Sequence, residues 1–266
     1  MRQPHPGPAV IILAKAPEPG RVKTRLCPPL TPGQAAELAA AALLDSVAAA
    51  AAVPGGHAVV VLTGNPGRAA RRDEVAAMLR TVTVLPQRGD GLGARIAAAH
   101  VDAAALLPGR CTLQIGMDTP QVGPLLADAA VTLDASGVDA VFGLATDGGW
   151  WALGLRDPAA AALVAAVPTS RPDTGERTLA ALRAGGLRVV LLSELSDVDT
   201  VADAAAVAAA APHTRFAAAV QALNRPPTPP TPNDAGKRAA LSHTPSVREC
   251  RSPRQERTAG GLDRAG

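Results

Sequence analysis

Four cations stand close together near the start of the chain. Lys15, Arg21, Lys23 and Arg25 fall within eleven residues, among prolines and a glycine. They directly follow a short apolar run, residues 10–13, which is typical of a buried β-strand. A diphosphate or triphosphate requires cations and free backbone N–H groups at such a place. The segment therefore predicts phosphate binding, and the alternative is a solvated basic loop.

Two aspartates follow other predicted strands. Asp118 stands in Ile-Gly-Met-Asp-Thr-Pro, after a strand at residues 111–115. Asp199 stands in Ser-Asp-Val-Asp-Thr, after a strand at residues 187–192. Carboxylate oxygens are the ligands that Mg²⁺ and Mn²⁺ prefer when they bind together with a nucleotide. We expect the sheet to bring the two carboxylates to one metal ion; the alternative is that each only caps a helix.

Two further segments are candidates for contacts with a substrate. The glycine-rich stretch at residues 86–95 lets a ligand approach the backbone closely, but it lacks the spacing of a dinucleotide-binding fingerprint. Trp150 and Trp151 follow an Asp-Gly-Gly turn that begins at Asp147. Because neighbours in a strand face opposite sides, one tryptophan can fill the core while the other lines a pocket. The alternative is two packing residues.

Strands and helices alternate along the chain and must position these residues. Strands are expected at residues 10–13, 57–63, 81–85, 111–115, 138–144, 150–155 and 187–192. Helices are expected at residues 31–52, 68–79, 94–107, after 124, at 157–165, at 176–184 and in two alanine-rich stretches before 223. This alternation predicts a mostly parallel sheet with ligands at the carboxyl ends of its strands. The fifth and sixth strands lie too close in sequence for a crossover helix, which predicts one antiparallel element.

Composition narrows the class of protein. The chain has 266 residues, of which 47% are hydrophobic, enough for a sizeable core. Its 3 cysteines are scattered, which excludes a disulfide framework and a CxxC metal site. The apolar run at residues 9–14 is too short for a signal segment or a membrane span, and later apolar runs are broken by proline, glycine or charge. We therefore expect a cytoplasmic protein with no membrane span.

The composition changes at residue 225. Residues 225–266 are rich in Pro, Ser, Thr and Arg, and they hold eight Lys or Arg against four Asp or Glu. The net charge of +3 therefore belongs to this segment, and residues 1–224 carry −1. We expect a folded domain at residues 1–224 and a disordered tail at residues 225–266. Because residues 1–224 have no basic stripe with aromatic residues, nucleic-acid binding is not expected.

Taken in order, these segments resemble the bacterial GT-A-superfamily transferases known as radical-SAM/selenodomain-associated transferases. They are more distantly similar to molybdenum-cofactor and phospholactate nucleotidyltransferases. The resemblance spans about residues 9–210 and rests on Ala-Lys-Ala-Pro-Glu-Pro-Gly-Arg-Val-Lys-Thr-Arg-Leu, the loop at Gln87, Gly-Met-Asp-Thr-Pro, Asp-Gly-Gly-Trp-Trp and Asp-Val-Asp-Thr. The chain departs from the family pattern at Thr119, where the family has Cys, at the tryptophan pair, where it has tyrosines, and at residues 167–170, which lack its Trp.

The resemblance implies a three-layer α/β GT-A fold and a metal-dependent glycosyltransferase. The donor would be a nucleotide-diphosphate sugar, and the acceptor is not indicated. Asp118 and Asp199 would hold Mg²⁺ or Mn²⁺, Asp147 would act as general base, and Lys23 would stabilise the leaving diphosphate. The implied substrate contacts are Lys15, Gly20, Lys23, Thr24, Arg25, Gln87, Gly91, Gly93, Arg95, Trp150 and Trp151.

Two alternatives stay open at this point. The same site could bind a nucleoside triphosphate for nucleotidyl transfer to a phosphorylated acceptor, and the cations after the first strand suit a triphosphate at least as well. The chain could also be a non-catalytic nucleotide-binding protein on a GT-A fold, although both aspartates and all the cations are present. No feature of the sequence indicates an oligomeric state.

Overall fold

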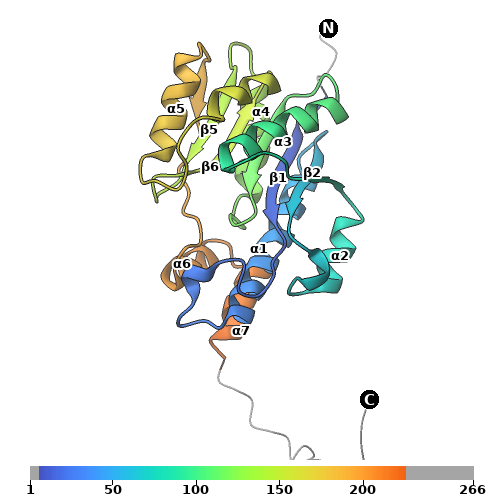
Figure 1. The fold of residues 1–266 in the computed structure, drawn as a ribbon, viewed down its shortest axis with the longest axis vertical. Coiled ribbons are helices and arrows are strands. Elements are labelled where there is room, and N and C mark those ends of the chain that lie inside the picture. Colours follow the sequence, from blue (N-terminus) through green and yellow to red (C-terminus); the bar gives the residue numbers. More distant parts are fainter. Residues whose placement is uncertain (1–5, 226–266) are drawn as a thin grey trace, which may run out of the picture. The chain divides into compact units, whose positions relative to one another are not determined.

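β1 (Ala9–Lys15) is a largely buried strand near the middle of a seven-stranded sheet. In this computed structural model, which describes residues 6–225, the strand order is β3-β2-β1-β4-β6-β5-β7 (Figure 1). The other strands are β2 (His57–Thr63), β3 (Thr83–Pro86), β4 (Thr112–Gly116), β5 (Ala140–Leu144), β6 (Trp150–Leu155) and β7 (Val189–Leu191). β6 runs antiparallel to β4 and β5, and the other paired strands are parallel. The predicted sheet, mostly parallel with one antiparallel element, is confirmed.

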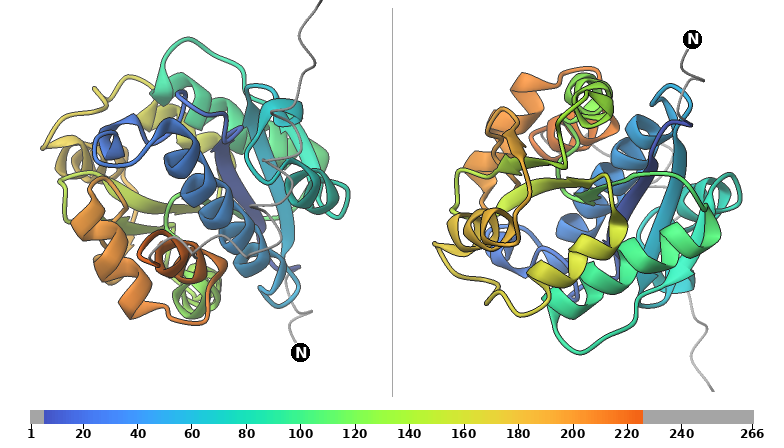
Figure 2. Two further views of the ribbon diagram at one scale, coloured as in Figure 1. Left: turned by 90° about the horizontal axis from the view of Figure 1, so that it is seen from below. Right: turned by 90° about the horizontal axis from the view of Figure 1, so that it is seen from above.

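Helices cover both faces of this sheet and complete three layers (Figure 2). One face packs against α1 and α4, and the other packs against α3, η3 and α5. α6 and α7 pack on the outer side of α1. The helices are α1 (Pro32–Ala51), α2 (Arg72–Leu79), α3 (Leu92–Leu106), α4 (Gly123–Asp134), α5 (Thr174–Ala184), α6 (Val201–Ala210) and α7 (Arg215–Leu223), with 3₁₀ turns η1 (Thr24–Leu26), η2 (Pro66–Arg68) and η3 (Pro158–Val164).

α1 begins where the sequence predicts, because its first turn is capped by side chains. The Thr31 hydroxyl accepts a hydrogen bond from the Gln34 N–H, and the Gln34 side chain accepts one from the Thr31 N–H. By length and hydropathy α1 could cross a membrane, but 72% of its apolar window is buried inside the domain. It is therefore the central core helix on its face of the sheet.

Two predicted helices differ in form. Residues 157–165 contain the 3₁₀ helix η3 where the sequence predicted an α-helix. The Asp157 carboxylate caps η3, and Pro158 is its first residue. Residues 68–79 contain the end of η2 and then α2, separated by Arg71, which has a left-handed backbone. The predicted tail, from residue 226 onward, lies outside the described residues and stays a prediction.

Candidate functional site

A cleft of about 690 Å³ opens at the carboxyl ends of the parallel strands. Lys15 ends β1, Thr63 ends β2 and Gly116 ends β4, and all three line it. Trp150 lies at the same edge because β6 runs in the opposite direction and begins there. Ligands of open α/β sheets bind at this edge, as the sequence predicted for this chain.

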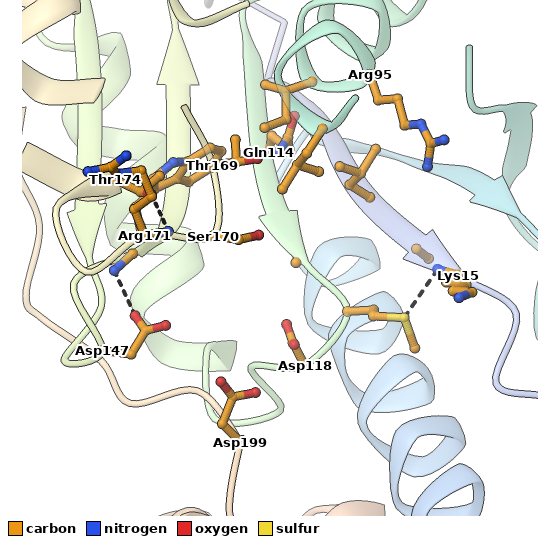
Figure 3. Close-up of a pocket in the computed structure, with 18 of the residues that line it drawn as sticks. Lys15, Arg95, Gln114, Asp118, Asp147, Thr169, Ser170, Arg171, Thr174 and Asp199 are labelled. Carbon is orange, nitrogen blue, oxygen red and sulfur yellow. Dashed lines mark hydrogen bonds between the residues drawn. The ribbon is translucent and has the colours of Figure 1, made fainter. Parts of the chain in front are cut away.

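Aspartates gather at one end of the cleft (Figure 3). Carboxylate oxygens of Asp147, Asp197 and Asp199 all lie within 4.8 Å of one another. The Lys23 amine joins Asp118 to this group, since Nζ lies 2.7 Å from Asp118 Oδ2 and 3.6 Å from Asp199 Oδ1. The sheet therefore brings together the two aspartates that were predicted to share a metal ion, with two more beside them. We call these four aspartates the acidic cluster.

Lys23 does not point to solvent, which argues against the alternative of a solvated basic loop at this position. Its side chain is only 14% exposed, whereas that of Arg25, which also pairs with Asp199 at 2.6 Å, is 73% exposed. Burial by itself lowers the pKa of Lys23, but the charges of Asp118, Asp199 and Asp197 outweigh burial and raise that pKa. Lys23 is thus a charged amine that offsets part of the negative charge of the acidic cluster.

Asp197 was not among the predicted site residues. Its segment is fixed by two contacts: Gln121 Nε2 donates to the Ser196 carbonyl at 2.5 Å, and Leu195 forms a bridge to Ala145. Burial, together with the charges of Asp147, Asp199 and Asp118, raises the pKa of Asp197 to about 6. The signal was the Asp-x-Asp spacing, because alternate residues of an extended segment face the same side.

A second, smaller chamber of about 100 Å³ lies beside the acidic cluster. Asp118, Asp147 and Asp197 line it together with Thr119. The Thr119 hydroxyl oxygen is buried and has no hydrogen-bond partner among the described residues. Three carboxylates and an unpaired hydroxyl are hard oxygen ligands. Such a set suits a divalent cation whose remaining ligands are water or phosphate oxygens.

Within residues 6–225, the other half of the cleft has no aspartate in its lining, and its cation Arg171 is paired with Asp173 at 3.2 Å, so we call it the neutral half. Gln114 from β4 and Trp150 from β6 form part of it, and the segment before α5 closes it with Thr169, Ser170, Arg171, Pro172 and Thr174 (Figure 3). This segment sits directly on the Asp-Gly-Gly turn: a side chain at Gly148 would clash with the Pro172 carbonyl, and Gly175 N–H donates to Gly148 O at 2.8 Å. None of the segment's residues was predicted to belong to the site, because no spacing pattern marks them.

The cleft contains eight of the predicted site residues: Lys15, Arg25, Gln87, Arg95, Asp118, Asp147, Trp150 and Asp199. Gln87 faces it in a fixed orientation, since its Nε2 donates to the carbonyl oxygens of Ala14 at 2.7 Å and Val61 at 3.1 Å. The predicted general base, Asp147, has its Oδ1 bonded to Gly149 N–H at 2.7 Å and belongs to the acidic cluster. That position makes it at least as well suited to hold a cation.

Six predicted site residues do not line the cleft: Gly20, Lys23, Thr24, Gly91, Gly93 and Trp151. Lys23 is turned into the acidic cluster, and Gly93 lies where α3 crosses η3, so that a side chain there would clash with the Ala165 carbonyl. Thr24 starts η1, and Gly20 and Gly91 shape the loops next to the site. Their contact with a substrate stays a prediction, and in this structure these residues lie beside the cleft and not in its lining.

Trp151 is a core residue. It is 3% exposed and its indole N–H donates to the Ser193 carbonyl at 3.0 Å. The β5–β6 register shifts here, with Gly143 opposite Ala152 and Leu144 opposite Trp150, so Trp151 is the extra residue of a bulge. Trp150 lines the cleft, as the sequence allowed for one tryptophan, and Trp151, although buried, borders the smaller chamber as well.

Comparisons with known proteins agree with this architecture. A family model described as "Uncharacterized protein conserved in bacteria (DUF2064)" matches residues 44–171. A search of curated proteins finds no match. The chain is similar to a crystal structure from Desulfovibrio desulfuricans G20, described as a candidate nucleotide-diphospho-sugar transferase, with 24% identity and a TM-score of 0.69 over 87% of this chain and 96% of that one.

A second solved structure has the same general fold. It is CMP:2-keto-3-deoxy-manno-octonic acid synthetase in complex with CTP, with 12% identity and a TM-score of 0.50 over 76% of this chain and 97% of that one. At these identities the likeness concerns the fold alone. The chain therefore has the three-layer α/β fold of the nucleotide-diphospho-sugar transferase type, as its sequence predicted.

Proposed function

We propose that this protein is a transferase that uses a nucleotide-diphosphate sugar as donor. The observation that carries the proposal is the division of a single cleft into an acidic end and a neutral end. A donor of this kind also has two parts: an anionic diphosphate, which binds together with a divalent cation, and an uncharged sugar. A volume of about 690 Å³ is within the range for ligands of this size. The similar structures support a nucleotide ligand: the candidate nucleotide-diphospho-sugar transferase fits this donor, and the synthetase in complex with CTP fits nucleotidyl transfer.

The acidic cluster fits Mg²⁺ or Mn²⁺, because it offers several hard oxygen ligands at one place. Asp199 would bind the ion together with Asp118, as the sequence indicated, or together with Asp147 and Asp197, whose oxygens lie nearest to it. When bound, such an ion withdraws charge from the leaving diphosphate.

The cations of the cleft would hold the phosphates. Lys15 lies at the end of β1 and has no ion-pair partner within residues 6–225, so its amine is available to a phosphate oxygen. Lys23 and Arg25 are paired with aspartates and would have to exchange these partners for phosphate. With two of the three predicted phosphate-binding cations already neutralised, the site favours a diphosphate over the more highly charged triphosphate.

A thermal-shift panel tests this function. UDP-glucose, GDP-mannose, UTP and CTP would each be added to the full chain, with and without Mn²⁺. A ligand present at about 100 times its Kd stabilises the folded state by about 2.7 kcal/mol, which corresponds to about 5–10 °C for a domain of this size. We expect the largest Mn²⁺-dependent shift from a sugar nucleotide. A larger shift from a triphosphate would favour nucleotidyl transfer, and no shift with any of these nucleotides would contradict the proposed function.

A further inference from the structure

Three polar side chains are buried under the neutral half of the cleft, on the face of the sheet that α3 covers. His100 on α3 is 0% exposed, and Thr112 and Gln114 on β4 are 0% and 2% exposed. Their surroundings are apolar, since Ile96 and Ala99 of α3 and Leu153 of β6 pack on the same face. Burying polar groups among apolar ones is unfavourable unless each finds a partner.

The contacts within this group leave atoms unpaired. His100 Nδ1 lies 2.7 Å from Thr112 Oγ1 and is satisfied. His100 Nε2 and Gln114 Oε1 are both buried without a hydrogen-bond partner among the described residues. Burial lowers the pKa of His100 to about 3, and the Gln114 amide is close enough to raise that pKa in part. The ring is therefore neutral at physiological pH, with the Gln114 oxygen on its side.

This arrangement orients the Gln114 amide. Its oxygen is buried, yet the residue lines the cleft, so the amide presents its nitrogen side to the cleft. An amide nitrogen donates hydrogen bonds, and its natural partner is a hydroxyl or carbonyl oxygen of a ligand. His100 and Thr112 lie beneath the amide and are not in the cleft lining, so they can hold it in place without contacting a ligand.

The neighbours of Gln114 indicate which part of a ligand it meets. Thr169 and Thr174 line the same half of the cleft as Gln114 (Figure 3), and Trp150 lines both the cleft and the smaller chamber beside the acidic cluster. An aromatic ring beside hydroxyl and amide groups complements a sugar, which has C–H surfaces and a rim of hydroxyl groups. A phosphate would instead require available cations, and the cation that lines this half, Arg171, is paired with Asp173 at 3.2 Å.

We propose that Gln114 is a specificity residue, which donates a hydrogen bond from Nε2 to an oxygen of the sugar on the donor, and that His100 and Thr112 are positioning residues for its amide. The proposal rests on the proposed function, since it assumes a nucleotide donor that carries a sugar. It assigns the sugar to the half of the cleft between β4, β6 and the segment before α5.

Calorimetry with matched ligands tests this assignment. UDP would be compared with UDP-glucose, and GDP with GDP-mannose, on the wild-type chain and on Gln114→Leu, all with Mn²⁺. We expect Gln114→Leu to weaken binding of the sugar nucleotide about tenfold and to leave the diphosphate unchanged, as for one lost hydrogen bond in a desolvated site. An equal loss for both ligands, or no loss for either, would overturn the assignment. If the wild-type chain binds none of the four, the proposed function itself is wrong.

Two more variants separate positioning from folding. Leu113→Ala removes a fully buried side chain from the opposite face of β4, so it should lower the melting temperature while the ratio of sugar-nucleotide to diphosphate affinity stays at the wild-type value. His100→Phe replaces the imidazole with a somewhat larger aromatic ring that has no nitrogens. We expect it to lower that ratio as Gln114→Leu does, although His100 is outside the cleft lining. A lower melting temperature with an unchanged ratio would show that His100 is only a packing residue.

Discussion

At the acidic end of the cleft, Asp118 and Asp199 are paired with Lys23, whereas at the neutral floor Gln114 and His100 each keep a buried atom without a partner in the described chain. Both ends place polar groups beside the apolar core, but two aspartates at the acidic end are in ion pairs, whereas atoms at the neutral floor are unpaired in the described chain. At the acidic end Asp118 and Asp199 already have cation partners, so a ligand that binds these aspartates or these cations must replace existing contacts. The unpaired atoms of the neutral floor lie beneath the cleft, and the nitrogen side of the Gln114 amide faces the cleft, so a ligand there adds a contact and replaces none. We therefore expect charge changes at one end and polarity changes at the other to have different consequences.

The largest effect is expected from removing one charge of the acidic cluster. Asp199→Asn keeps the shape of the side chain, deletes a charge that two cations now contact, and removes an oxygen ligand for a metal ion. We expect nucleotide affinity in the presence of Mn²⁺ to fall about a hundredfold or more, and affinity without Mn²⁺ to change little. Calorimetry with the best ligand of the thermal-shift panel, with and without Mn²⁺, measures both.

Asp102→Asn is the matched control for this charge. Asp102 lies on α3, pairs with Arg88 at 2.6 Å and is not in the cleft lining. The substitution therefore removes one negative charge from an ion pair outside the site. Affinity with Mn²⁺ should stay close to the wild-type value. If Asp199→Asn binds the nucleotide with full Mn²⁺ dependence, the acidic cluster does not hold the metal ion.

At the neutral floor the expected effect depends on pH. Burial lowers the pKa of His100 to about 3, whereas an unfolded histidine has a pKa of about 6.5. Between these values the unfolded chain binds a proton that the folded chain does not, so the stabilisation from His100 is complete above about pH 6.5 and is lost as the pH falls. At pH 5 the loss is about 2 kcal/mol.

Urea unfolding at pH 7 and pH 5 measures this contribution. His100→Gln has no titrating ring, so its free energy of unfolding should fall by about 2 kcal/mol less than that of the wild type between the two pH values. The same fall in both proteins would mean that His100 takes up its proton while the domain stays folded. That result would also remove the basis for a neutral ring beside the Gln114 amide.

The sequence predicted the acidic end better than the neutral floor, for a physical reason. Asp118 and Asp199 each follow a strand, and in a sheet with parallel strands the residues that follow the strands meet at one edge whatever the loops do. Lys23 reaches Asp118 across 95 positions of sequence, and nothing local indicates whether its amine faces solvent or the aspartates. The sequence could therefore identify Lys23 as a site residue, but not its contact with Asp118.

The neutral floor depends on features that no local pattern carries. Gln114 lies inside a strand whose burial pattern is otherwise that of the core, and it belongs to the site only because α3 places His100 beside it. Thr169 to Thr174 line the cleft because their segment folds over the Asp-Gly-Gly turn, and Trp150 faces it because of a bulge. Each of these is a long-range packing result, whereas the strands and most helices follow from periodicity and caps.

The smallest effect, and the one that distinguishes the two ends most directly, is expected from Lys23→Met. Methionine keeps the length and the apolar stem of the side chain but removes the amine that lies 2.7 Å from Asp118 and 3.6 Å from Asp199. Without nucleotide, Mn²⁺ must compete with this amine in the wild type. We therefore expect Lys23→Met to bind Mn²⁺ alone about tenfold more tightly, measured by calorimetry, since about 1.4 kcal/mol of competing interaction is removed. With Mn²⁺ present, the same variant should bind nucleotide about tenfold more weakly, because the amine that would contact a phosphate is gone.

Lys15→Met is the control, since Lys15 lines the cleft without an ion pair to any carboxylate in residues 6–225. Its loss should weaken nucleotide binding and leave the affinity for Mn²⁺ alone unchanged. If Lys23→Met weakens both metal and nucleotide binding, the amine stabilises the acidic cluster and does not compete with a metal ion. The contrast between the two ends of the cleft would then be wrong.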